Sequence, residues 1–246
     1  RLEAPVRAAD HVRVATELTK YLLSLAELEP AARDARVTTA PVPPVDWMAV
    51  ARAHHRPLSI GRRLLVVPPW EVPGSSEREI LVIEPGMAFG TGQHATTRSC
   101  LEAIEGVLDA APIGVALDVG TGSGVLALAL ARLGVARVVA LDLDPAVLPL
   151  ARATLLRNGA PHVLLLAGTV AAVRLRADLV VANLLADTIV AEAPALGAAV
   201  RPGGRLVLSG ILVAQAPAVR NAFPGWSLAD TRTADGWETM TLRRAG

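Results

Sequence analysis

Apolar residues in the second half of the chain fall into short runs that alternate with longer helical patterns. The short runs predict buried strands near residues 115–119, 137–142, 162–167, 178–182 and 205–209. Apolar positions at helical spacing predict helices near residues 125–133, 145–158, 187–200 and 213–222. The strand-helix alternation therefore predicts a doubly wound, mostly parallel α/β sheet.

The C-terminal segments 226–233 and 237–243 predict a β-hairpin. Only Ala234-Asp235-Gly236 separates them, and an Asp-Gly pair favours a tight turn between two strands. The sheet should therefore end in an antiparallel strand.

The first part of the chain predicts a separate small unit over residues 1–44. Residues 8–28 have apolar positions at helical spacing, and residues 35–40 are compatible with a strand. The prolines in segment 41–44 are incompatible with a regular element and are typical of a stiff linker. We expect a linker region over residues 45–80, with a helix at 46–55 and a strand at 63–67, and a main domain over residues 81–246.

The most informative motif is the run 117–125, Leu-Asp-Val-Gly-Thr-Gly-Ser-Gly-Val, between a predicted strand and a predicted helix. An acid followed by alternating glycines at this point is typical of a nucleotide-binding turn. The next predicted strand ends on Asp142, whose carboxylate can accept hydrogen bonds from both hydroxyls of a ribose. Together these residues predict an adenosine site.

The glycine spacing restricts the kind of nucleotide. The dinucleotide motif G-x-G-x-x-G requires a third glycine where this chain has Val125, and no Gly-Lys-Ser/Thr follows to hold a triphosphate. An adenosine ligand without phosphates remains, its anionic group held by backbone N–H groups at the helix N-terminus. S-adenosylmethionine, with its carboxylate, fits this description.

A second glycine-rich segment covers residues 84–97, Glu-Pro-Gly-Met-Ala-Phe-Gly-Thr-Gly-Gln-His-Ala-Thr-Thr. So many glycines indicate a loop that approaches a ligand closely. A helical pattern follows, and Thr96 or Thr97 is the expected N-cap.

On these motifs the chain resembles the ribosomal protein L11 methyltransferases of the PrmA type. The resemblance covers about residues 45–246, whereas residues 1–44 match only in size and position. It rests on segment 84–97, the glycine turn and these further segments: Asp46-Trp47, 66–70, 141–145, 180–187 and 208–212.

The resemblance implies a Rossmann-like, seven-stranded methyltransferase sheet with a small N-terminal α/β unit that recognises the substrate. It also implies transfer of methyl groups from S-adenosylmethionine to lysine ε-amines and the N-terminal α-amine of ribosomal protein L11. The cofactor contacts expected from it and from the two glycine-rich segments are Phe89, Thr91, Thr97, Asp118, Gly120, Gly122, Asp142 and Asn183.

Asn183 and His94 are the candidate catalytic residues. Asn183 follows the strand at 178–182, at the sheet edge where doubly wound folds bind ligands. Its side-chain oxygen can accept an amine N–H and so orient the amine lone pair. His94 would orient substrate or accept a proton, or else bond only to loop backbone. Residues 167–170 lack the acid with which many methyltransferases bind the adenine amino group.

Composition excludes several other classes. The formal charge is +1, from 24 basic and 23 acidic residues, so there is no electrostatic footprint for nucleic acid. Cys100 is the only cysteine, which excludes an internal disulfide and a cysteine metal cluster and favours a reducing, cytoplasmic location. No apolar run reaches the length of a membrane span, and residues 1–10 lack a signal-peptide layout. We expect a monomer without a metal site.

Three alternatives remain open. The chain could methylate lysines of another protein, such as electron-transfer flavoprotein. It could be an NAD-dependent oxidoreductase, which Val125 disfavours. It could also be a regulatory protein that binds the cofactor without turnover, which an intact Asn183 disfavours.

Overall fold

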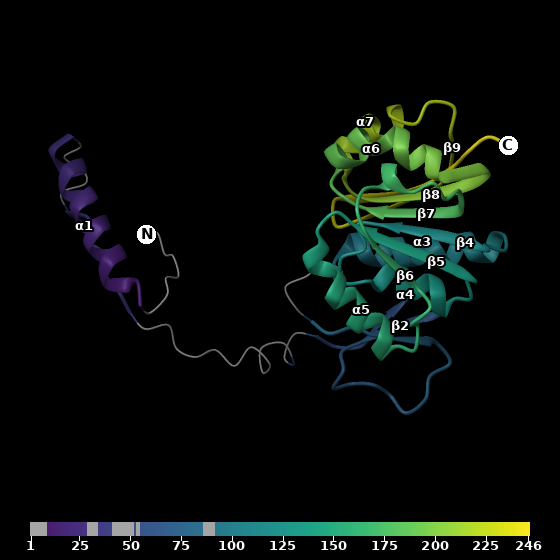
Figure 1. Ribbon diagram of the computed structural model, residues 1–246, viewed down its shortest axis with the longest axis horizontal. Coiled ribbons are helices and arrows are strands. Elements are labelled where there is room, and N and C mark those ends of the chain that lie inside the picture. The colour runs from purple at the N-terminus through teal and green to yellow at the C-terminus, as the bar shows by residue number, and fades with distance from the viewer. Residues whose placement is uncertain (1–8, 29–33, 41–51, 53–54, 86–91) are drawn as a thin grey trace. The chain divides into compact units, whose positions relative to one another are not determined.

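The computed structural model describes residues 9–28, 34–40, 52, 55–85 and 92–246 (Figure 1). It separates two compact units, residues 1–50 and 51–246. In the first unit, helix α1 (His11–Leu28) covers the segment predicted as helical. The strand predicted at 35–40 is wrong, because these residues have no regular structure and pair with no strand among the described residues.

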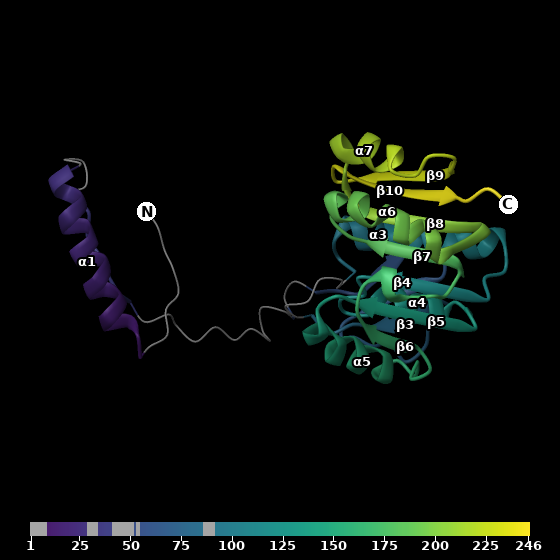
Figure 2. The ribbon, with the colours of Figure 1, turned by 45° about the horizontal axis from the view of Figure 1, so that its top comes forward.

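The second unit contains a seven-stranded sheet in the order β6-β5-β4-β7-β8-β10-β9 (Figure 1). Strands β4 to β8 are parallel, while β10 is antiparallel to both β8 and β9 (Figure 2). The predicted fold class is confirmed. The strands are β4 (Val115–Val119), β5 (Arg137–Asp142), β6 (Leu164–Ala167), β7 (Ala177–Asn183), β8 (Val200–Leu212), β9 (Ser227–Ala234) and β10 (Trp237–Arg243).

Helices cover both faces of this sheet (Figure 1). They are α3 (Ala95–Ala110), α4 (Val125–Arg132), α5 (Leu148–Arg157), α6 (Ala186–Ala199) and α7 (Ala216–Asn221). Short 3-10 helices complete the connections: η2 (Pro145–Val147), η3 (Val170–Ala172) and η4 (Val213–Gln215). The helices predicted at 145–158 and 213–222 thus each begin with a 3-10 turn.

Two hydrophobic cores lie on opposite faces of the sheet, because successive side chains of a strand point to opposite sides. On β7, Leu179 and Val181 belong to the core that α3 and α4 complete. Val180 and Ala182 belong to the core that α6 and α7 complete. Burial on both faces explains why the central strands are continuous apolar runs.

A second, three-stranded sheet joins β1 (Leu58–Ile60), β2 (Leu64–Val67) and β3 (Glu79–Val82). Of these, only β2 lies where a strand was predicted. Ile60, Leu64 and Leu81 are fully buried in the same core as α3 and α4. Most of the helix predicted at 46–55 lies outside the described residues. The roles assigned to residues 1–44, 45–80 and 81–246 stay predictions.

The hairpin of β9 and β10 confirms the prediction made from its turn. Asp235 and Gly236 have φ values of 51° and 79°, the left-handed conformation that a two-residue turn requires. Arg98 on α3 donates to the Asp235 carboxylate at 3.0 Å, so the turn is tied to the start of that helix. Among the described helices, none has the length and apolar character needed to cross a membrane.

Glu105 on α3 connects the small sheet to the main core. It is only 4% exposed, and its two carboxylate oxygens accept the backbone N–H groups of Arg62 and Arg63, both at 2.9 Å. A Cβ on Gly61 would lie 2.1 Å from the same carboxylate, so the turn between β1 and β2 fits closely around it.

We expect Glu105→Ala to lower the free energy of unfolding by about 2–4 kcal/mol, because two backbone N–H groups lose their charged acceptor. Urea unfolding of the whole chain measures this loss. The control is Glu102→Ala on the same helix, whose half-exposed carboxylate lies 3.5 Å from Arg232. That change should cost less than about 1 kcal/mol. Equal effects of the two substitutions would contradict a bridging role for Glu105.

Candidate functional site

The turn between β4 and α4 is held by the end of strand β5. The N–H groups of Gly120 and Thr121 donate to the Leu141 carbonyl at 2.9 and 3.0 Å. The N–H of Gly122 donates to the Asp142 carboxylate at 3.0 Å. These three N–H groups are therefore engaged within the protein, whereas the anion site expected from the sequence involves the N–H groups at the start of α4 and stays a prediction.

Leu184 packs against two glycines of the site. Gly120 has φ 75°, and a Cβ there would lie 2.4 Å from Leu184 Cδ2. Gly210 on β8 has φ 83°, and a Cβ there would lie 2.2 Å from the Leu184 carbonyl oxygen. Both positions require glycine, for the backbone conformation and for the space. The end of β7 thus lies directly against the glycine turn.

Asp118 lies beneath this turn and is completely buried. One carboxylate oxygen accepts the Thr121 hydroxyl at 2.7 Å and the Ala127 N–H at 3.1 Å. The other oxygen has no hydrogen-bond partner within the described part of the chain. Burial, and secondarily the nearby charge of Asp142, raises the pKa of Asp118 to about 7 against the lowering effect of its two hydrogen bonds.

Asp142 closes strand β5 with its carboxylate fixed by two backbone groups. One oxygen accepts from Gly122 and the other accepts from the N–H of Asp144, both at 3.0 Å. The side chain remains partly exposed. Since a carboxylate oxygen has capacity for more than one hydrogen bond, both oxygens can also accept from a ligand.

Asn183, at the end of β7, belongs to a hydrogen-bonded chain with the start of α3. Its side-chain Nδ2 donates to Thr96 Oγ1 at 3.3 Å, and Thr96 Oγ1 lies 2.7 Å from His94 Nδ1. The two candidate catalytic residues are therefore linked through a residue that the sequence analysis treated only as a possible helix cap.

His94, rather than Thr96 or Thr97, is the N-cap of α3. Its Nδ1 accepts the Thr96 N–H at 3.3 Å, which is the bond that a Ser or Asp side chain usually makes at this position. The prediction of Thr96 or Thr97 as the N-cap was wrong, because histidine is uncommon at this position and was not considered. The His94 ring also packs edge-to-face on Trp237 of β10, with centroids 5.3 Å apart.

Thr97 is buried to 1% exposure, and its hydroxyl has no hydrogen-bond partner among the described residues. An unpartnered buried hydroxyl is costly unless a ligand satisfies it. Phe89 and Thr91, the other site residues predicted in the loop before α3, lie outside the described residues.

A buried polar cluster behind Asn183 was missed by the sequence analysis. Ser209 Oγ lies 2.6 Å from Thr239 Oγ1 and donates to the Thr96 carbonyl at 3.3 Å. Cys100 is buried beside Ser209, and burial raises the pKa of its thiol to about 12, so it is an inert core residue. The only sign of this cluster in the sequence was the presence of polar residues within apolar strand patterns.

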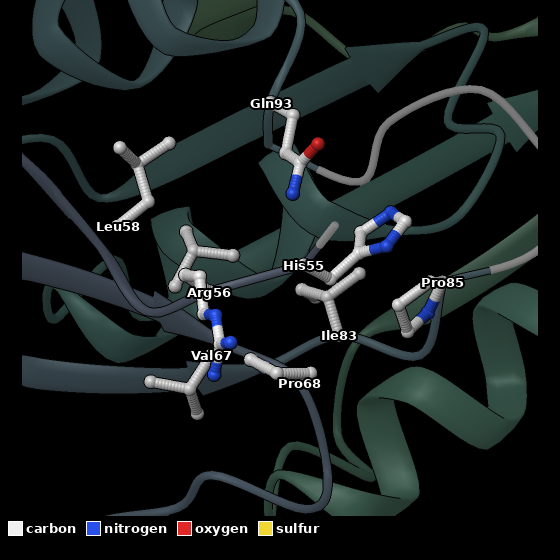
Figure 3. Close-up of a pocket in the computed structure, with 9 residues that line it drawn as sticks. His55, Arg56, Leu58, Val67, Pro68, Ile83, Pro85 and Gln93 are labelled. Atoms are coloured by element: carbon white, nitrogen blue, oxygen red, sulfur yellow. The ribbon is translucent and has the colours of Figure 1, made fainter. Parts of the chain in front are cut away.

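The site residues meet at the carboxyl edge of β4, β5 and β7, and they do not line the pocket drawn in Figure 3. The empty space in and above that pocket is about 250 Å³, open solvent included. Its lining contains none of the site residues predicted from the sequence. The lining residues are His55, Arg56, Leu58, Val66, Val67, Pro68, Ile83, Pro85 and Gln93. The described residues contain no group of three or more side chains that could hold a metal ion.

Comparison with known proteins gives consistent matches over most of the chain. The family model described as "Ribosomal protein L11 methyltransferase (PrmA)" matches residues 3–245. A ribosomal protein L11 methyltransferase from Pelobacter propionicus is 41% identical over 236 residues, which cover 93% of this chain and 76% of the relative. One from Pelotomaculum thermopropionicum is 45% identical over 208 residues, covering 83% and 67% of the two chains.

A solved structure agrees with these matches. The ribosomal protein L11 methylase from Lactobacillus delbrueckii subsp. bulgaricus superposes with a TM-score of 0.72 and 30% identity. The match covers 78% of this chain and 100% of that one.

The raised pKa of Asp118 predicts a pH-dependent stability. Between pH 4 and 7 the folded protein retains a proton that the unfolded chain has released. The free energy of unfolding should therefore fall as the pH rises through this window, by about 1.4 kcal/mol for each pKa unit that separates the two states. Asp118→Asn should remove this contribution, so the variant gains stability relative to the wild type between pH 4 and 8.

Urea unfolding without ligand at several pH values in this window measures the difference. Asp230→Asn, on the exposed strand β9, is the control and should follow the wild-type profile. Parallel profiles for Asp118→Asn and the wild type would show that Asp118 titrates alike in the folded and unfolded states.

Proposed function

This chain belongs to the ribosomal protein L11 methyltransferase family, and we propose that it methylates lysine ε-amines and the N-terminal α-amine of ribosomal protein L11. It is a methyltransferase whose cofactor is S-adenosylmethionine. The observation that carries the proposal is the meeting of Asp142, the glycine turn and Asn183 at one edge of the sheet. These elements give a site for an adenosine ligand beside a side-chain amide that can orient an amine.

The described residues fit the cofactor. Asp142 would bind the ribose hydroxyls, since both of its oxygens are held in place by backbone N–H groups and the residue is partly exposed. The buried hydroxyl of Thr97 and the second oxygen of Asp118 are the unpartnered polar atoms that a ligand, directly or through water, would satisfy. We assign Gly120 and Gly122 to the same site, because the glycine turn runs along the sheet edge where the ligand would bind. We assign Phe89 and Thr91 to the same site from the resemblance alone.

The bound cofactor supplies a methyl group on a sulfonium, which a neutral amine can attack. Asn183 Oδ1 would accept an N–H of that amine and direct its lone pair along the line of transfer. Such positioning can account for about 7 kcal/mol or more of the barrier. A lysine amine, with an ordinary pKa near 10.4, must first lose a proton, and desolvation in the site lowers that pKa.

The proposed role of His94 is positional. Its Nδ1 is occupied by Thr96, so this nitrogen is an acceptor within the protein rather than a base for the substrate. We propose that His94 fixes the start of α3 beside Asn183, with Trp237 packed edge-to-face on its ring.

Other parts of the proposal rest on the family. Residues 1–44 would present the protein substrate, and the enzyme would act as a monomer in the cytoplasm, where its substrate is made. A lysine methyltransferase for another protein, such as electron-transfer flavoprotein, is the alternative acceptor. An NAD-dependent oxidoreductase is disfavoured by Val125, which is 2% exposed and packed in the core where a dinucleotide fold needs its third glycine.

The test is methyl transfer from labelled S-adenosylmethionine to purified ribosomal protein L11, with the modified amines located by mass spectrometry. The wild type should label L11 at lysines, and Asn183→Ala should reduce kcat about a hundredfold, since the amine loses its orientation. Cofactor affinity should change little. Labelling of another protein in a ribosome-free lysate, but not of L11, would overturn the proposed substrate.

Asp142→Ala should weaken cofactor binding by about 2 kcal/mol, roughly thirtyfold, because charge-assisted hydrogen bonds to the ribose are lost. Calorimetric titration measures the affinity. Asp144→Ala is the matched control, since its exposed carboxylate only caps η2 through the Ala146 N–H at 2.9 Å. An unchanged affinity in a folded Asp142→Ala variant would show that the ribose binds elsewhere.

A further inference from the structure

Thr96 contacts several polar groups of the site through its hydroxyl, its N–H and its carbonyl. It is 1% exposed. Its hydroxyl contacts both Asn183 and His94, its N–H donates to His94, and its carbonyl accepts from Ser209. The hydroxyl thus connects the start of α3 with the end of β7.

The direction of each hydrogen bond follows from the groups available. His94 Nδ1 accepts the Thr96 N–H, so this nitrogen carries no proton of its own. The bond of 2.7 Å between Nδ1 and Thr96 Oγ1 must then take its proton from the threonine hydroxyl. A hydroxyl has one proton, so towards Asn183 the oxygen can only accept.

This restriction decides how the Asn183 amide is turned. Its NH₂ group must face Thr96, where the distance is 3.3 Å, and its carbonyl oxygen must therefore point the other way. With the amide reversed, two acceptor oxygens would face each other. The orientation that places Oδ1 where it can accept from an amine is thus imposed by Thr96.

We propose that Thr96 is a positioning residue for methyl transfer, which acts by fixing the orientation of the Asn183 side-chain amide. The inference rests on the proposed role of Asn183 in holding the acceptor amine. It does not require Thr96 to touch the cofactor or the substrate.

The surroundings of Asn183 explain why this orientation needs a partner. Oδ1 lies on the Gly210 side, where a Cβ would be 3.2 Å from Oδ1 and 2.2 Å from the Leu184 carbonyl oxygen. A reversed amide would turn its NH₂ towards the side of that carbonyl, which can accept a hydrogen bond. Without the Thr96 hydroxyl, little would oppose the reversed state.

The experiment compares three variants of the whole chain in methyl transfer to ribosomal protein L11. Thr96→Val removes the hydroxyl and preserves the shape of the side chain. It should lower kcat about tenfold, the size expected for one buried hydrogen bond, with cofactor affinity and KM for L11 within about twofold of the wild type. Thr96→Ser restores the hydroxyl and should return kcat to within about threefold of the wild type.

Thr239→Val is the matched control for the loss of a buried hydroxyl. Thr239 is 2% exposed and bonds to Ser209 in the same cluster, but none of its hydrogen bonds reaches Asn183. Its substitution should lower the urea midpoint about as much as Thr96→Val and leave kcat unchanged. A fall in kcat that simply follows stability in both variants would overturn the proposal.

A double-mutant cycle with Asn183→Ala tests whether Thr96 acts through Asn183. If it does, Thr96→Val should have no further effect on kcat once the amide is absent. The inference would be overturned if the effects of the two substitutions on kcat multiply in the double variant. It would also be overturned if a folded Thr96→Val variant keeps the wild-type kcat. Failure of the wild type itself to methylate L11 would instead overturn the proposed function, so the two failures are distinguishable.

Discussion

Parallel hydrogen bonding between β5, β4 and β7 aligns the carboxyl ends of these strands at one level, and the site is built there. Val119 lies opposite Leu141 on one side and Ala182 on the other. The next residue on each strand is Gly120, Asp142 or Asn183. Three residues with different chemistry therefore emerge side by side, because the register of three buried strands is the same. A shift of one residue in any of these strands would exchange the two faces of that strand and remove one member of the site.

The carboxyl group of Asp118 lies beneath this level, where burial penalises its charged form. Asp118 is buried among apolar strands, and half of its carboxylate lacks a partner within the described residues. Its other oxygen joins the turn to the first turn of α4 through Thr121 and Ala127. Since the turn's own N–H groups bond to β5, the acid stabilises the side of the turn that β5 does not reach. The glycine turn is thus held from both sides before any ligand binds.

The sequence predicted the sheet well because burial on both faces leaves an unambiguous apolar pattern in its central strands. The Asp-Gly turn likewise predicted the last hairpin, since few residues tolerate positive φ. The sequence analysis missed β1 and β3, which have three and four residues and include the polar Ser59 and Glu79. It found β2, which is also four residues long but is an uninterrupted apolar run. The cap at His94 and the contacts of Thr96 also escaped. Both depend on side chains from distant segments, and Asn183 and Thr96 are 87 positions apart.

The position of the site between two hydrophobic cores bears on how the enzyme loses activity on heating. Thr96 and Thr97 lie on α3, which closes one core, whereas Leu184 precedes α6, which closes the other. Partial opening on either face of the sheet would separate the two halves of the site while most of the fold survives. Thermal inactivation would then follow the opening of the less stable face of the sheet, at a lower temperature than global unfolding. Stabilising only the other face would extend the lifetime of the fold without extending that of the activity.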